Sequence, residues 1–119
     1  MRLTRAMVIA LAAGLAACGS STDYGSNPSS CTPSATQICM TAATYAPAAL
    51  TVTAGTNVTW RDASGIAHTI TSDPGAAETF DLSTVAGGTA SRGFNATVNY
   101  HCKIHGAPGT GMHGTITVN

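Results

Sequence analysis

Residues 38–119 show no helical period, and this feature constrains the fold more than any other. Apolar side chains instead alternate with polar ones over short runs, as at Leu50 and Val52 or Val58 and Trp60, and Gly, Pro, Asn and Asp interrupt these runs. A period of two is typical of strands that bury one face. Turns at intervals of about ten residues are typical of sandwiches and barrels. The pattern therefore predicts an all-β fold, an antiparallel β-sandwich.

The length of the chain fits one folded domain. It has 119 residues, and one domain typically takes about 100–200 residues. Only about eighty residues carry the strand pattern, and a core of this size gains useful stability from a disulfide or a metal. Residues 73–88 are expected to be mostly connection, with room for a short helix.

Charge excludes some functions. Beyond residue 17 the chain has three basic and five acidic side chains, a net charge of −2. No basic stripe is present, so an electrostatic surface for nucleic acid is excluded. The length excludes a multidomain enzyme.

The first 17 residues form a predicted signal peptide. Arg2 and Arg5 precede twelve apolar or small residues at positions 6–17, a run too short to span a bilayer, which takes about twenty residues. The sequence Leu15-Ala16-Ala17-Cys18 resembles a bacterial lipobox, which implies cleavage before Cys18 and lipidation of its thiol. The alternative is an ordinary signal peptide followed by an incidental cysteine. We expect an exported lipoprotein of the cell envelope, held at the periplasmic face or outer membrane if the host has two membranes.

A flexible linker is predicted after the lipidated cysteine. Fourteen of the nineteen residues at positions 19–37 are Ser, Thr, Pro, Gly or Asn, and such a segment has little apolar surface to bury. The predicted organisation is therefore a signal peptide (1–17), the lipidated cysteine with its linker (18–38) and a folded domain (39–119).

The other three cysteines have separate predicted roles. Cys31 and Cys39 are candidates for a disulfide, because an exported protein meets an oxidising compartment; the alternative is that both are free. Cys102 is then left alone. A lone thiol in such a compartment is expected to be buried, ligated or reactive.

The strand period also predicts which side chains point inward. His68 is in phase with Ile66 and Ile70, so all three should face the interior. Cys102 is in phase with Tyr100 and should also face the interior.

The last part of the chain adds a thioether to this predicted interior. Met112 is in phase with the final strand and should join the inner side, whereas His101 and His113 are one residue out of phase and should face solvent. His105 lies three residues after Cys102, on the predicted loop between the last two strands.

One end of the sandwich therefore gathers two imidazoles, a thiol and a thioether. His68, Cys102, His105 and Met112 match the ligand set of a trigonal copper site with a weak axial methionine. The Cys-x-x-His spacing lets one loop offer two ligands, and His68 comes from a strand 34 residues upstream of Cys102. Zinc is an alternative metal, since two histidines and a cysteine can also hold Zn²⁺.

Four blocks of sequence resemble plastocyanin-type cupredoxins, the type 1 blue copper proteins. The resemblance covers residues 39–119, and its blocks are Asn57-Val58-Thr59-Trp60, His68-Thr69-Ile70-Thr71-Ser72-Asp73, Tyr100-His101-Cys102-Lys103-Ile104-His105 and Met112-His113-Gly114-Thr115-Ile116-Thr117-Val118. It implies a Greek-key β-sandwich of about eight strands. It also implies one type 1 copper, bound by His68, Cys102, His105 and Met112, and single-electron transfer.

The resemblance further implies how electrons leave. His105 would be the route at the solvent edge, within an apolar docking patch at residues 106–108. One departure concerns the loop, because six residues separate His105 from Met112, more than plastocyanins usually have. The longer loop therefore leaves two candidates for the axial ligand, Met112 and, if the register slips, His113.

The predicted function is single-electron transfer by a monomeric, membrane-tethered protein. Its partners would be redox proteins, such as a cytochrome c, an oxidase or a reductase. It is not predicted to be an enzyme, because a copper enzyme would need a second histidine-rich site. Alternatives that stay open are a copper-handling lipoprotein and a metal-free interaction domain. For Asp62, two residues after Trp60, a hydrogen bond that braces the ligand loop and a plain turn are equally consistent with the sequence.

Overall fold

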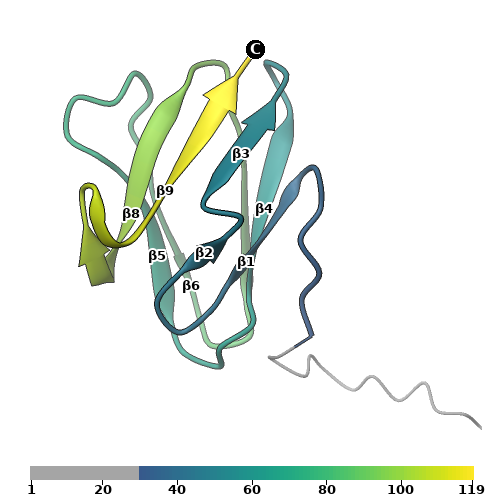
Figure 1. The fold of residues 1–119 in the computed structure, drawn as a ribbon, viewed down its shortest axis with the longest axis vertical. Coiled ribbons are helices and arrows are strands. Elements are labelled where there is room, and N and C mark those ends of the chain that lie inside the picture. Colours follow the sequence, from purple (N-terminus) through teal and green to yellow (C-terminus); the bar gives the residue numbers. More distant parts are fainter. Residues whose placement is uncertain (1–29) are drawn as a thin grey trace, which may run out of the picture.

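Residues 30–119 of the computed structural model form two β-sheets of nine strands and, in this described part of the chain, no helix (Figure 1). The predicted all-β sandwich is confirmed, with nine strands where about eight were expected. The strands are β1 (Gln37–Met40), β2 (Tyr45–Ala46), β3 (Ala49–Val52), β4 (Asn57–Asp62), β5 (His68–Ser72), β6 (Asp81–Thr84), β7 (Thr89–Gly93), β8 (Val98–Ala107) and β9 (Thr110–Val118). Nothing among residues 30–119 qualifies as a helix that could cross a bilayer.

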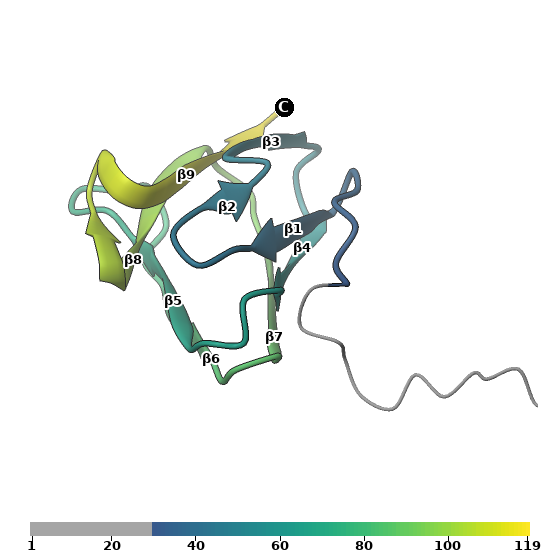
Figure 2. The same cartoon turned by 60° about the horizontal axis from the view of Figure 1, so that its bottom comes forward.

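Two sheets face each other across the interior (Figure 2). The four-stranded sheet has the order β2-β1-β4-β7, and the five-stranded sheet has the order β3-β9-β8-β5-β6. The prediction of antiparallel sheets is correct only in part. Strand β1 runs parallel to β4, and β3 runs parallel to β9, whereas the other pairs are antiparallel. Strands that are neighbours in a sheet are thus often distant in the sequence, and this brings β5, β8 and β9 side by side.

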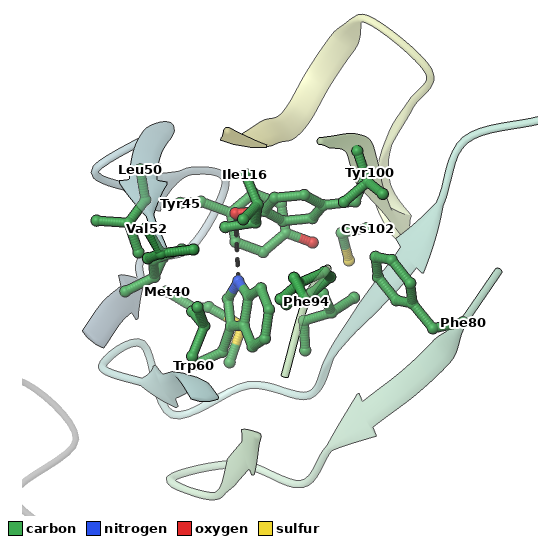
Figure 3. Close-up of a cluster of buried hydrophobic side chains, with 14 of the residues drawn as sticks. Met40, Tyr45, Leu50, Val52, Trp60, Phe80, Phe94, Tyr100, Cys102 and Ile116 are labelled. Carbon is green, nitrogen blue, oxygen red and sulfur yellow. Dashed lines mark hydrogen bonds between the residues drawn. The ribbon is translucent and has the colours of Figure 1, made fainter. Parts of the chain in front are cut away.

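The core is a continuous apolar cluster between the sheets (Figure 3). Trp60 packs edge-on against Tyr100 and Phe94, with ring centroids 5.6 and 5.8 Å apart. The indole Nε1 of Trp60 donates a hydrogen bond of 3.2 Å to the hydroxyl of Tyr100, so this buried polar pair is satisfied. Cys102 is a fully buried member of the same cluster, so the apolar core contains a thiol.

Two features concern the N-terminal part of the domain. Strand β1 begins at Gln37, within the segment predicted as linker, and Cys31 is joined to Cys39 of β1 by a disulfide with a Cα–Cα distance of 5.7 Å. Because the loop that it closes is short, this disulfide fastens the chain before β1 directly to the four-stranded sheet. The predicted signal peptide, Cys18 and the first part of the predicted linker lie outside the described residues.

Two predictions about the middle of the chain need correction. Residues 73–88 are mostly connection, as predicted, but in place of a short helix they contain β6, which pairs with β5 at the edge of the five-stranded sheet. Ile66 is 39% exposed, although it is in phase with His68. Strand β5 begins only at His68, so the period of two does not extend back to the turn that contains Ile66.

Candidate metal centre

Three side chains from two neighbouring strands converge at the inner face of the five-stranded sheet. His68 is the first residue of β5, and Cys102 and His105 belong to β8. One donor atom from each lies within 4.8 Å of the others. The Sγ atom of Cys102 is 4.0 Å from Nδ1 of His68 and 3.6 Å from Nδ1 of His105. His68 and Cys102 are buried, whereas His105 is half-buried, so the group reaches the surface through His105.

An irregularity in β8 explains how Cys102 and His105 can share one site. Residues three apart on a regular strand face opposite sides of the sheet. The β8–β9 register shifts between His101 and Gly106, and such a bulge turns the side chains that follow it. His105 therefore lies on an irregular strand, where the sequence predicted a loop.

Met112 occupies the inner side of β9, as its phase predicts. Its side chain is fully buried, whereas His113 is exposed. The backbone of Met112 lies against Gly106, where an added Cβ would come within 2.5 Å of the Met112 nitrogen. Gly111 has a φ of +64°, in the left-handed region that glycine tolerates best. These two glycines let the longer loop fold back, and it is Met112 rather than His113 that faces the interior.

A hydrogen bond and a neighbouring carboxylate at Nε2 fix the orientation of His68. The hydroxyl of Ser64 lies 2.8 Å from His68 Nε2, and a carboxylate oxygen of Asp62 lies 3.4 Å from it. With Nε2 engaged on this side, Nδ1 faces the thiol of Cys102. Metal-binding histidines are commonly oriented in this way through their second nitrogen.

Asp62 is a buried carboxylate that organises the loop before β5. It accepts hydrogen bonds from the backbone nitrogens of Ser64, Gly65 and Gly87, at 2.8, 3.0 and 2.7 Å. Burial opposes ionisation, but the hydrogen bonds from Gly87 and Ser64 outweigh it and hold the pKa of Asp62 below its usual value. Of the two roles left open for Asp62, bracing of the ligand loop is the one observed. Burial lowers the pKa of His68, and the nearby carboxylate of Asp62 offsets part of this decrease.

Thr69 supports Cys102 through its backbone and its side chain. The amide nitrogen of Thr69 donates to Cys102 Sγ at 3.4 Å, and the amide of Lys103 donates to the Thr69 hydroxyl at 2.8 Å. The Tyr45 hydroxyl donates to the Thr69 carbonyl at 2.6 Å. A hydrogen bond to sulfur favours the thiolate, the form that binds metals. Burial, and then the nearby Cys102, raise the pKa of Tyr45.

Sequence reasoning missed this support because Thr69 shows no pattern of its own. The one sequence signal for Thr69 is its position directly after the predicted ligand His68. The structure adds that its side chain is only 9% exposed. Asp62 has a clearer signal, because it is in phase with the buried Val58 and Trp60 and therefore points inward.

His101 differs from its prediction. It is only 8% exposed, and its Nδ1 lies 2.6 Å from a carboxylate oxygen of Asp73. The strand phase correctly gave His101 the face opposite Cys102, but contacts with the segment around Asp73 cover it there. His113, on the same outer face, is exposed as predicted.

The donors fit copper on their chemistry. Imidazole nitrogen suits copper and zinc, while thiolate and thioether sulfur favour copper in its lower oxidation state. His68, Cys102 and His105 supply the first two donor types, and Met112, buried on the inner side of β9, is the candidate for the third. Side chains that only pack together do not need donor atoms. A buried thiol held by a hydrogen bond, with two imidazoles beside it, is therefore better explained as a ligand group than as packing.

No protein-family model matches the sequence, and no curated protein sequence matches it. Solved structures do resemble the fold. A purple cupredoxin from Nitrosopumilus maritimus is 26% identical, with a TM-score of 0.57, over 70% of this chain and 98% of that chain. Amicyanin from Paracoccus versutus is 18% identical, with a TM-score of 0.60, over 77% of this chain and 88% of its own. The Cu(I) form of an amicyanin variant is 23% identical, with a TM-score of 0.59, over 77% and 89%.

These structures share a sandwich and differ widely from this chain in sequence. The match extends over most of the length of each of these structures, 98% of the purple cupredoxin and 88% of the amicyanin from Paracoccus versutus. Its two sheets form a cupredoxin-like β-sandwich, and its His-Cys-His group fits an electron-transfer copper protein.

Proposed function

We propose that this chain carries single electrons through one type 1 copper held by His68, Cys102 and His105, with Met112 as the weak axial ligand. The observation that carries the proposal is the convergence of one sulfur and two imidazole donors within 4.8 Å in a cupredoxin-like sandwich. Copper bound by such ligands supplies a one-electron couple. Uptake and release of an electron is the whole reaction, so no enzymatic activity is proposed.

The protein's contribution is to hold the donors in place. Ser64 and Asp62 orient His68, and the Thr69 amide engages Cys102. Because neighbouring strands fix these side chains, the ligand positions need to change little when an electron arrives or leaves. Small movement keeps electron transfer fast.

Partner docking is proposed at the end where His105 reaches the surface. Within residues 30–119 the exposed large apolar side chains are Ile66, Val85 and Ile104. Ile104 precedes His105, Ile66 lies two residues before His68, and Val85 follows Thr84, which pairs with His68. An apolar surface around an electron exit suits transient contact with a redox protein, such as a cytochrome c, an oxidase or a reductase. The low net charge suits short-range docking, so added salt should change the association rate little.

Membrane tethering is a separate part of the proposal. The lipobox-like sequence at Cys18 supports lipidation, and the linker that follows would give the domain reach from the membrane of the cell envelope. Intact mass of the chain isolated from cells tests this. A diacylglyceryl-sized addition that disappears in Cys18→Ser is expected, and an unmodified thiol would contradict it.

Voltammetry of the copper-loaded chain tests the redox function. We expect a reversible one-electron wave and rapid electron exchange with a small cytochrome c. Ile104→Ser should slow that exchange without moving the potential, because it removes apolar docking surface and adds no charge. Thr51→Ser, on an exposed position of β3, is the matched control and should leave the rate unchanged. Tight copper binding without a reversible wave would contradict electron transfer and support copper handling.

A further inference from the structure

The outer face of the β8–β9 hairpin carries two imidazoles directly opposite each other. His101 of β8 pairs in register with His113 of β9. Opposed residues of an antiparallel pair project from the same face, with Cβ atoms about 4.5–5.5 Å apart. Their neighbours Cys102 and Met112 point the other way and are fully buried. The histidine pair is therefore separated from the candidate copper centre by the sheet itself.

Both imidazoles are anchored through the same nitrogen. Nδ1 of His101 lies 2.6 Å from the Asp73 carboxylate, and Nδ1 of His113 lies 3.0 Å from the carbonyl oxygen of Gly111. A carboxylate and a carbonyl only accept, so Nδ1 donates in each case and Nε2 of the neutral ring keeps its lone pair. Among the described residues, no hydrogen-bond partner occupies either Nε2 atom.

This arrangement is the one that metal-binding histidines usually have. Such a histidine donates its second ring nitrogen to a carboxylate or a backbone carbonyl, which fixes the tautomer and raises the basicity of the ligating nitrogen. Asp73 does this for His101, and Gly111 does it for His113. Asp73 also places a negative charge beside the pair, whereas Lys103, the one lysine of the sequence, is paired with Asp81 at 2.6 Å.

We propose that His101 and His113 form a second, surface metal site for a borderline divalent ion such as Cu²⁺ or Zn²⁺, with Asp73 as a positioning residue. Imidazole is a preferred ligand of both ions. Opposed strand residues have Cβ atoms about 4.5–5.5 Å apart, and a shared ion requires the two Nε2 atoms to approach it to about 2.0–2.1 Å each. His113 is exposed, so an ion can enter from solvent. The remaining coordination positions are open to water or to a ligand from another molecule.

The test is a Cu²⁺ titration of the tag-free full chain followed by electron paramagnetic resonance. One equivalent is expected at the thiolate site, and a second should give the wide hyperfine splitting of ordinary copper with nitrogen coupling. His113→Gln should abolish the second signal and leave the first intact. Asp73→Asn should weaken the second site by about 10–100-fold, the usual cost of losing such a support. Thr115→Ala, at the next outward position of β9, is the matched control and should change neither signal.

A reciprocal variant keeps this test independent of the proposed function. His105→Gln should disrupt the thiolate site and keep the second signal, so failure of the copper centre would leave the surface site measurable. Zn²⁺ calorimetry should show the same loss in His113→Gln. Absence of a second equivalent in the unmodified chain, or its persistence at full strength in His113→Gln, would overturn the proposal. Since His113 is exposed, its substitution should not impair folding.

Discussion

The five-stranded sheet supplies all four proposed copper ligands, whereas the four-stranded sheet contributes mainly apolar side chains to the buried interior. Five polar side chains are buried among residues 30–119: four (His68, Thr69, Thr84 and His101) belong to the five-stranded sheet, and Asp62 belongs to the other. Burying polar groups costs free energy unless they are bonded. The contrast indicates that one sheet carries the chemistry while the other supplies apolar contacts that stabilise it.

Trp60→Ala tests the stabilising role of the four-stranded sheet and has the largest expected effect on stability. Trp60 is fully buried in β4 and contacts Tyr100 and Phe94, so its truncation should lower the free energy of unfolding by about 3–5 kcal/mol. Thr59→Ala, next to it, loses one hydrogen bond to Ser91 and should cost only about 0.5–1.5 kcal/mol. Urea unfolding measures both.

Trp60→Ala also tests whether the two sheets have separate roles. If the four-stranded sheet is structural, the copper spectrum of folded Trp60→Ala should match that of the unmodified chain. A changed colour would mean that the two sheets are not separable in this way.

Removing the disulfide is the next test. Cys31→Ala/Cys39→Ala frees the chain before β1, and loop entropy predicts a loss of about 2–3 kcal/mol for a loop of this length. The Cys102 thiol is untouched, so copper binding should stay the same. Equal unfolding midpoints for the two proteins would show that the disulfide contributes nothing to the four-stranded sheet.

Asp62→Asn tests how far the roles of the two sheets are separate, because Asp62 lies on the four-stranded sheet but contacts His68 of the five-stranded sheet. Loss of a buried, charge-assisted acceptor should cost about 1–3 kcal/mol. The native pKa of Asp62 is below its usual value, so its contribution is present above the unfolded pKa of about 4. It is lost as pH falls through the native value.

Thermal unfolding of the metal-free protein at several acidic pH values measures this contribution. Asp62→Asn should flatten the fall in stability at low pH. Asp81→Asn is the control, since Asp81 is paired with Lys103 and both side chains are about half exposed; it should matter much less. Equal effects of the two substitutions would remove the special role of Asp62.

Substitution of Met112, on the five-stranded sheet that carries the proposed ligands, has the smallest expected effect on stability. Met112→Leu nearly conserves volume and should cost less than about 1.5 kcal/mol. It removes a thioether donor, so the reduction potential should rise, whereas Met112→Gln offers an oxygen that favours Cu(II) and should lower it. Voltammetry measures the potential of both variants. If neither substitution changes it, axial ligation by Met112 is excluded.

The sequence predicted much of the fold because local alternation carries it. The period of two placed Val58, Trp60, Tyr100 and Met112 on the inner faces correctly. It could not show where β5 begins, so Ile66 was misplaced. The pairing of β6 with β5, and the cover that Asp73 gives His101, depend on contacts between distant segments that no local pattern encodes.

The candidate site was predictable only in its donor types and phase. The Cys-x-x-His spacing and the phase of His68 pointed to the three side chains that converge. The bulge that turns His105 toward Cys102, and the Thr69 amide on the sulfur, arise from strand pairing. Sequence spacing alone does not define either contact.

The most direct test of the central claim is the visible and electron paramagnetic resonance spectrum of the chain after addition of Cu²⁺, measured beside Cys102→Ser. Serine keeps the size of the side chain but removes the sulfur. We predict an intense visible band with narrow copper hyperfine splitting that vanishes in Cys102→Ser. Absence of that band in the unmodified chain, or its survival in Cys102→Ser, would contradict a thiolate copper centre at His68, Cys102 and His105.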